Sequence, residues 1–128
     1  MISLLEKIKN FDDNYLTVYD IEKLLFGGEN INQKDEEGNT LLIYAINYAN
    51  YDCVKLLLNF GLEINETNNN GISPLFFAVK KGNETILQTL LEYNIEDKYI
   101  DEALSYSIKN NKLNILNILM NYVNNVPK

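Results

Sequence analysis

The chain has 128 residues, of which 46% are hydrophobic and 23% charged, a composition that suits one compact domain and argues against intrinsic disorder. Its net charge is −7 and all of its basic residues are Lys, so the basic, Arg-containing face typical of nucleic-acid-binding proteins is not expected. The sequence has no His and only one cysteine, Cys53, which removes the commonest general base near neutral pH and any intrachain disulfide.

The first residues show no sign of export or membrane insertion. Residues 1–7 lack the basic segment followed by an apolar segment that defines a signal peptide. Apolar runs such as residues 56–58 are too short to cross a bilayer. We therefore expect a soluble, cytoplasmic protein that binds neither membranes nor nucleic acid.

Two helices are predicted in the first part of the chain. Apolar residues at helical spacing predict one helix over residues 2–11. Residues 17–20 resemble a capping box and predict a second helix that ends near Phe26. We interpret residues 1–32 as an N-terminal capping repeat.

A shift of the sequence by 33 positions places chemically similar residues over one another. The matching pairs include Gly38 with Gly71, Thr40 with Ser73, Ala45 with Ala78, Asn50 with Asn83, and Leu57 with Leu90. So many matches at a single offset indicate two internal repeats, residues 33–65 and residues 66–98.

Each repeat is predicted to begin with a turn and to continue as two short helices. The turns at residues 35–38 and 68–71 end in Gly, which adopts positive φ without steric cost. Thr40 and Ser73 then stand where the N-cap of a first helix belongs. The second helix, capped by Asn50 or its counterpart, carries apolar residues at i, i+3 and i+4, which predict one buried stripe.

These segments resemble the repeats of a known family. Gly38–Ala45 and Gly71–Ala78 are similar to the G-x-T-P-L-H-x-A signature of ankyrin repeats, and Leu57–Asn65 resembles the L-L-x-x-G-A-x-x-N ending of that repeat. The resemblance covers most of the chain. It implies an all-α solenoid of about four stacked helix pairs, in which two full repeats lie between degenerate capping repeats, as a single domain over residues 1–128.

Several positions depart from the family pattern. Ile43 and Phe76 replace the family's His, so the usual hydrogen bond from that His back to the Thr is not expected. Ala49 replaces the Gly between the two helices, and we expect the neighbouring Asn50 to take the left-handed conformation there. Asn94 replaces the Gly that ends the second helix and is expected to form a left-handed cap.

The last segment, residues 99–128, is interpreted as a C-terminal capping repeat without a finger turn. Residues 101–109 predict its first helix, and Asn111 aligns with Asn50 when about five residues are removed from the preceding loop. The second helix is predicted to have an inward stripe and a separate polar face. The stripe comprises Ile115, Ile118, Leu119 and Tyr122, and the polar face comprises Asn110, Asn114, Asn117 and Asn121.

The sequence contains few residues in patterns suited to catalysis or to metal binding. Acidic residues cluster in turns, but none has the alternate spacing and Gly hinge of a calcium loop. Gly27 and Gly28 follow a helix instead of opening one, so they form no phosphate cradle. Cys53 precedes Val54 on the inward side of a helix and is expected to be a packing thiol. We expect no metal, no cofactor and no enzymatic activity.

Binding is the remaining role, and the resemblance implies that it uses side chains on the concave surface of fingers and first helices. Tyr48 is the strongest single candidate, because large amphipathic side chains are enriched at interface hot spots. Its alternative role is packing against Lys81 or the chain's own loops. The candidate partner-binding residues are Lys34, Glu36, Glu37, Asn39, Asn47, Tyr48, Thr67, Asn69, Asn70, Ile72, Lys80 and Lys81.

Two functional hypotheses follow. The first is a non-catalytic protein–protein interaction module, monomeric when free, that binds a partner protein through the concave surface. The second is a dedicated inhibitor of a basic partner, such as an immunity protein that neutralises a toxin, possibly a nuclease. The acidic turn at residues 35–37 could steer a basic partner or simply keep the protein soluble, and Asp35 itself is expected to serve the turn.

Overall fold

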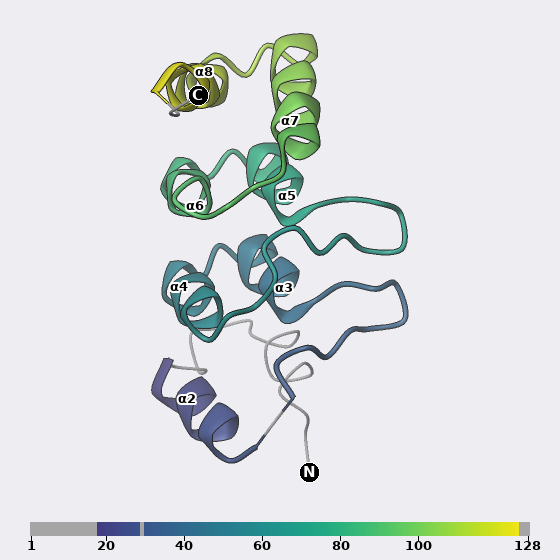
Figure 1. Cartoon of the computed structure of the whole chain (residues 1–128), viewed down its shortest axis with the longest axis vertical. Coiled ribbons are helices and arrows are strands. Elements are labelled where there is room, and N and C mark those ends of the chain that lie inside the picture. Colours follow the sequence, from purple (N-terminus) through teal and green to yellow (C-terminus); the bar gives the residue numbers. More distant parts are fainter. Residues whose placement is uncertain (1–17, 29, 126–128) are drawn as a thin grey trace.

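The computed structural model describes residues 18–28 and 30–125 (Figure 1). Its helices are α2 (Val18–Phe26), α3 (Leu41–Asn47), α4 (Tyr51–Asn59), α5 (Pro74–Lys81), α6 (Glu84–Leu90), α7 (Asp97–Lys109) and α8 (Leu113–Asn125). Within these residues the only β-type pairing is an isolated bridge between Lys34 and Thr40. The prediction of an all-α fold is confirmed. The helix predicted over residues 2–11 lies outside the described residues.

The helices stack as hairpins in two columns. Figure 1 shows α3, α5 and α7 in one column and α2, α4, α6 and α8 in the other, with two long fingers projecting beside α3 and α5. The pairs α3–α4, α5–α6 and α7–α8 pack as hairpins, and neighbouring helices within each column also pack against each other. This is the arrangement of a solenoid, in which a repeat contacts its neighbours and no distant unit.

The predicted caps start the first helix of each full repeat. The Thr40 hydroxyl accepts a hydrogen bond from the backbone N–H of Ile43 at 3.2 Å, and the Ser73 hydroxyl accepts one from Phe76 at 3.1 Å. Pro74 occupies the first helical position of α5, where its missing N–H leaves no bond unmade. An N-cap of this kind is worth about 1 kcal/mol.

Second helices begin in the same way, after a left-handed residue. The Asn50 side chain accepts from the backbone N–H of Cys53, and Asn83 accepts from that of Ile86. The residue before each cap is left-handed: φ is 55° at Ala49 and 72° at Gly82. The expectation that Asn50 would be left-handed is therefore wrong, because Ala49 takes the left-handed conformation and Asn50, with a φ of −89°, is the N-cap of α4.

The C-terminal helix pair begins earlier than the sequence predicts, and its register differs by one residue. α7 starts at Asp97, and Asn111, with φ of 57°, stands two residues before α8 as Ala49 stands two residues before α4. Asn111 is thus the counterpart of Ala49, and the expected alignment with Asn50 is wrong. The left-handed cap expected at Asn94 is also not formed, because α6 ends early and a turn from Tyr93 carries the chain onward.

The core runs through the whole stack. Leu57, Leu90 and Leu119 occupy equivalent positions of α4, α6 and α8, and each is completely buried. Cys53 is 1% exposed, so the predicted packing role of its thiol is confirmed. The predicted stripe of α8 is buried or half-buried, and its predicted asparagine face is exposed. Within the part of the chain that the structure describes, no helix has the length and apolar character needed to cross a bilayer.

Candidate binding surface

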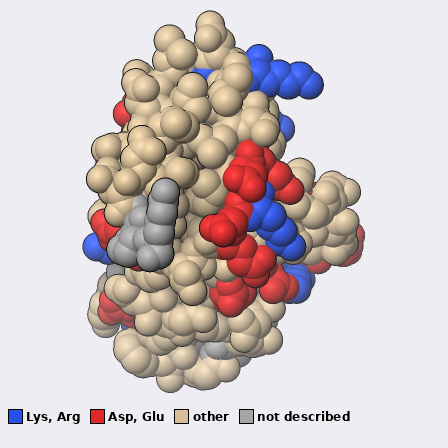
Figure 2. Space-filling view, turned by 45° about the horizontal axis from the view of Figure 1, so that its top comes forward, with Lys and Arg blue, Asp and Glu red and all other residues tan. Residues whose placement is uncertain are grey.

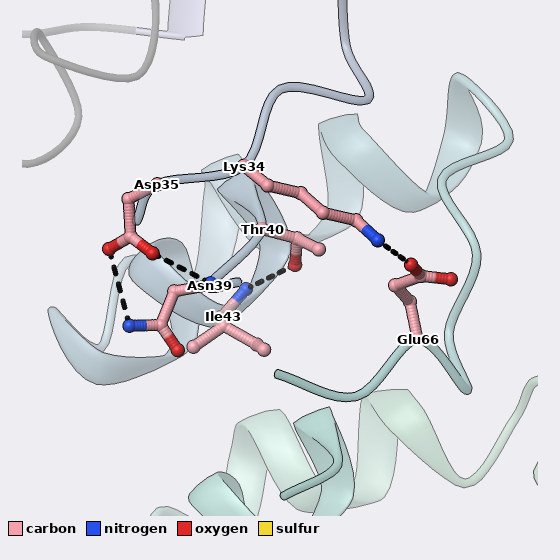
Figure 3. A network of polar contacts seen from close by, with 6 residues as sticks. All are labelled: Lys34, Asp35, Asn39, Thr40, Ile43 and Glu66. Atoms are coloured by element: carbon pink, nitrogen blue, oxygen red, sulfur yellow. Dashed lines mark hydrogen bonds and ion pairs between the residues drawn. The ribbon is translucent and has the colours of Figure 1, made fainter. Parts of the chain in front are cut away.

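The first finger is built around Asp35. Its Oδ1 atom accepts hydrogen bonds from the backbone N–H groups of Glu37 at 2.9 Å and Asn39 at 2.8 Å, and Tyr44 donates its hydroxyl hydrogen to Oδ2. Figure 3 shows the carboxylate facing Asn39. The expectation that Asp35 serves the turn is confirmed.

These contacts change the acidity of both side chains. Burial acts to raise the pKa of Asp35, but the hydrogen bonds from Tyr44, Asn39 and Glu37 outweigh it, so the pKa lies below its usual value. Burial, reinforced by the bond to Asp35, raises the pKa of Tyr44 to about 12. The pair therefore exists as a carboxylate and a neutral phenol near neutral pH, which fixes the finger to the surface of α3.

The second finger repeats this design with an amide. Asn68 Oδ1 accepts from the backbone N–H groups of Asn70 at 2.9 Å and Ile72 at 3.0 Å. An Asn or Asp that holds the backbone two and four residues ahead is a common turn device. Both fingers thus have the same internal framework in spite of their different charge.

The two fingers are also bonded to each other. The backbone N–H of Asn69 donates to the carbonyl of Glu37 at 2.9 Å, and its side-chain amide donates to the carbonyl of Glu36 at 3.0 Å. Asn68 donates from Nδ2 to Oδ1 of Asn39 at 3.0 Å. An ion pair between Lys34 and Glu66, shown in Figure 3, adds a further link at the base. The fingers therefore form one ordered surface.

The structure divides the predicted binding residues into two groups. Lys34, Glu37, Asn39 and Asn69 have side-chain bonds within the finger network, so part of their bonding capacity is already used. The other group is wholly or partly exposed beside that network. It comprises Glu36, Asn47, Tyr48, Thr67, Asn70, Ile72, Lys80 and Lys81.

Tyr48 lies at the end of α3 and is 40% exposed. Its ring stacks on that of Tyr44, with centroids 6.4 Å apart and an interplanar angle of 19°. The stack holds the side chain in a defined position and leaves much of it in solvent. The contact with Tyr44 differs from the packing against Lys81 or a loop that was the alternative from the sequence, and a binding role for the exposed part of Tyr48 stays a prediction.

Sequence reasoning missed a row of aromatic residues beside Tyr48. Tyr44, Phe77 and Tyr106 occupy equivalent positions of α3, α5 and α7, and all three are half-buried. Phe76 packs edge-on against Tyr106, with ring centroids 4.9 Å apart. The 33-residue offset already pairs Tyr44 with Phe77, but Tyr106 joins the row only in the register that aligns Asn111 with Ala49.

Acidic side chains form a patch on one side of the molecule. Figure 2 shows Asp and Glu gathered on one face with a few Lys among them. Among the exposed acidic residues, Glu96, Asp97, Asp101 and Glu102 lie at or just before the start of α7, and Lys98 Nζ lies 3.8 Å from Glu96 Oε2. This face would attract a positively charged molecule.

The thiol and the acidic side chains of the described residues were candidates for chemistry. Burial, together with the charge of Asp52, raises the pKa of Cys53 to about 12, which leaves the thiol protonated and unreactive. No group of three or more metal-ligating side chains comes together in residues 18–28 and 30–125. A hollow of about 240 Å³ beside the first finger is lined by Lys34, Glu63 and Glu66, of which Lys34 and Glu66 form an ion pair.

Comparison with known proteins agrees with this architecture. The family model described as "Ankyrin repeats (3 copies)" matches residues 15–101 and, in a second placement, residues 61–127. Among curated proteins, no relative matches the chain. With turn, helix and helix recurring in the matched residues, the chain belongs to the ankyrin-repeat family, whose members are generally protein–protein interaction modules.

Proposed function

We propose that this chain binds a partner protein through its finger face, defined as residues 34–39 and 67–72 with the exposed sides of α3 and α5. The observation that carries the proposal is the bonding of Asn69 to the carbonyls of Glu36 and Glu37. These bonds use the backbone carbonyls of the glutamates, so both side chains stay exposed on an ordered support, and Glu37 Oε2 also accepts a hydrogen bond from Asn39 Nδ2 at 3.3 Å.

A binding surface that is ordered before its partner arrives favours high affinity. A flexible loop loses conformational freedom when it binds, at a cost of about 0.5–1.5 kcal/mol for each side chain that becomes fixed. The finger network and the Tyr44–Tyr48 stack have already fixed much of this surface. The expected contact residues are therefore Glu36, Glu37, Asn70 and Tyr48, with Lys80 and Lys81 on the helix behind them. The activity is non-catalytic and needs no metal or cofactor.

A pull-down from the native host tests this proposal, using a matched pair of tyrosines. Tyr48 on α3 and Tyr51 on α4 are 40% and 37% exposed, but only Tyr48 lies on the finger face. Tyr48→Ala and the double change Lys80→Glu/Lys81→Glu should each lose the same captured protein, whereas Tyr51→Ala should retain it. Equal loss in Tyr51→Ala, or retention in both finger-face variants, would place binding elsewhere.

The acidic character supports a second candidate, inhibition of a basic partner. A net charge of −7 and the acidic face in Figure 2 would speed association with a positively charged surface, such as the phosphate-binding cleft of a nuclease toxin. The chain would then act as an immunity protein. Coexpression with a toxin encoded by a neighbouring gene should restore growth, and Glu36→Lys/Glu37→Lys should abolish the rescue. No rescue by the unaltered chain would rule out this role.

A further inference from the structure

The last helix pair keeps apolar residues at positions that other repeats bury. Aligned on their left-handed residues, Ile46 of α3 and Val79 of α5 correspond to Ile108 of α7. Ile46 and Val79 are completely buried, whereas Ile108 is 64% exposed. The difference arises because a following hairpin covers the first two positions and no described residue covers the third.

The second helix shows the same pattern. Leu58 of α4 is 5% exposed, but its counterpart in α8, Met120, is 44% exposed. Leu116 is half-buried, although its counterparts in α4 and α6 are completely buried. We name this surface the end face. It comprises Ile108, Leu113, Leu116, Met120 and Val123.

A terminal repeat that faces water normally carries polar residues on its outer side. Ile108, Leu116 and Met120 of the end face instead hold positions that are buried in the internal repeats, and Leu113 and Val123 extend this apolar surface. The asparagine face of α8 is exposed as predicted, but it lies beside the end face and does not cover it. A contiguous apolar surface of this kind is typical of an interaction site.

Charge indicates what covers the end face. Residues 113–125 of α8 contain no charged side chain, although the whole chain carries −7. Along α7, Asp97, Asp101 and Glu102 lie in the first half together with Lys98, and Lys109 lies at the end. When the two-fold axis lies in the contact plane and runs perpendicular to α7, the α7 helices of two copies run antiparallel, so the acidic first half of each meets the basic end of the other. This pairing reduces the repulsion expected from the net charge of two copies.

We propose that two copies of this chain associate end face to end face about a two-fold axis, so that α7 and α8 of both form a four-helix contact. This proposal differs from the sequence-based expectation of a free monomer, which took no account of the exposure of Ile108 and Met120. It is independent of partner binding, because the fingers lie on another side of the stack (Figure 1). The dimer would present two finger faces.

Sedimentation velocity on the full chain over a range of concentrations tests the proposal. The unaltered chain should form a dimer, and Ile108→Glu and Leu113→Glu should each weaken dimerisation at least about tenfold, since each places two like charges in the two-fold contact. The fold should tolerate Leu113→Glu, because its counterpart in α6 is Glu84. Circular dichroism checks that both variants keep their helices.

Tyr51→Glu is the matched control, because Tyr51 occupies in α4 the position of Leu113 in α8 but lies outside the end face. This variant should dimerise like the unaltered chain. A monomeric unaltered chain, dimers retained by both end-face variants, or equal loss in Tyr51→Glu would each overturn the proposal.

Discussion

Gly38 of the first finger lies against Asn69 of the second so closely that a side chain has no room there. A Cβ atom built on Gly38 would lie 2.4 Å from Oδ1 and 2.8 Å from the backbone nitrogen of Asn69. Gly71 is its counterpart one repeat later and has a similar φ, 75° against 80°, but nothing lies within 4 Å of its Cβ position. A comparison of these two positions therefore distinguishes the effect of backbone strain from the effect of steric crowding.

Replacing each glycine by alanine should therefore have unequal effects. Gly71→Ala should lower the free energy of unfolding by about 1 kcal/mol, because only the positive φ opposes the new side chain. Gly38→Ala should cost about 1–3 kcal/mol more, because Asn69 must also move. Urea denaturation of both variants measures the difference. Equal losses would show that the fingers separate easily.

Ala49 is a residue with a side chain in a backbone conformation that suits glycine. Its φ is 55°, and Gly82 holds the same place one repeat later. Ala49→Gly should raise the free energy of unfolding by about 0.5–1 kcal/mol, since relief of the left-handed strain exceeds the entropy cost of glycine. The reverse change, Gly82→Ala, should lower it by a similar amount. Thermal or urea denaturation checks both, and a loss of stability in Ala49→Gly would contradict the assignment of strain.

Asp35 should contribute to acid sensitivity. Because its pKa in the folded protein lies below the ordinary 3.8, its contribution to stability is present above that value and is lost as the pH falls through the folded pKa. Tyr44→Phe removes one of the hydrogen bonds that lower the pKa. NMR titration of the Asp35 carboxyl carbon should show its pKa rising toward 3.8 in this variant. An unchanged pKa would mean that the backbone N–H groups alone set it.

The same pair, Asp35 and Tyr44, should also affect the stability of the protein at alkaline pH. The pKa of Tyr44 is raised from 10.0 to about 12, so the folded state favours the neutral phenol. Stability from this residue is complete below pH 10 and declines as the pH rises from 10 toward 12. Stability curves of the unaltered chain and of Tyr44→Phe should therefore converge over this range. Parallel curves would contradict the shifted ionisation, and Cys53 affects both proteins alike.

Cys53 should be a reporter of unfolding. The thiol is buried and its pKa is raised to about 12, so a thiol-specific reagent should react slowly with the folded protein at neutral pH and rapidly in urea. The labelling rate should follow the unfolded fraction measured by circular dichroism. Rapid labelling in native buffer would mean that α4 opens locally, without global unfolding.

The sequence was sufficient for features that depend on local chemistry. Thr40, Ser73, Asn50 and Asn83 are caps as expected, because an N-cap needs only a side-chain acceptor beside its own helix. The buried stripes were predictable for a similar reason, since their spacing follows from helix geometry. The family resemblance then supplied the order in which the helices stack.

Features that depend on contacts between repeats could not be predicted from the sequence. Nothing in the sequence around Asn69 reveals that its amide bonds to a carbonyl in the preceding finger. The register of the last pair was missed by one residue, because two consecutive asparagines, Asn110 and Asn111, offer equally acceptable candidates for a left-handed turn. The exposure of Ile108 depends on the absence of a described neighbour, which no local pattern encodes.

The polar links between repeats have a consequence for how such a chain folds and evolves. In the described residues, Asn69 reaches back 33 positions to Glu36, Asn65 reaches forward 29 to Asn94, and Tyr93 reaches back 34 to Asn59. None of these links requires closure of a loop much longer than one repeat. Folding can therefore spread outward from any repeat that forms first, and the entropic cost of adding each further repeat is nearly constant. A gene duplication that inserts a further unit would leave the existing links intact, and the length of the molecule is thereby free to vary while its architecture persists.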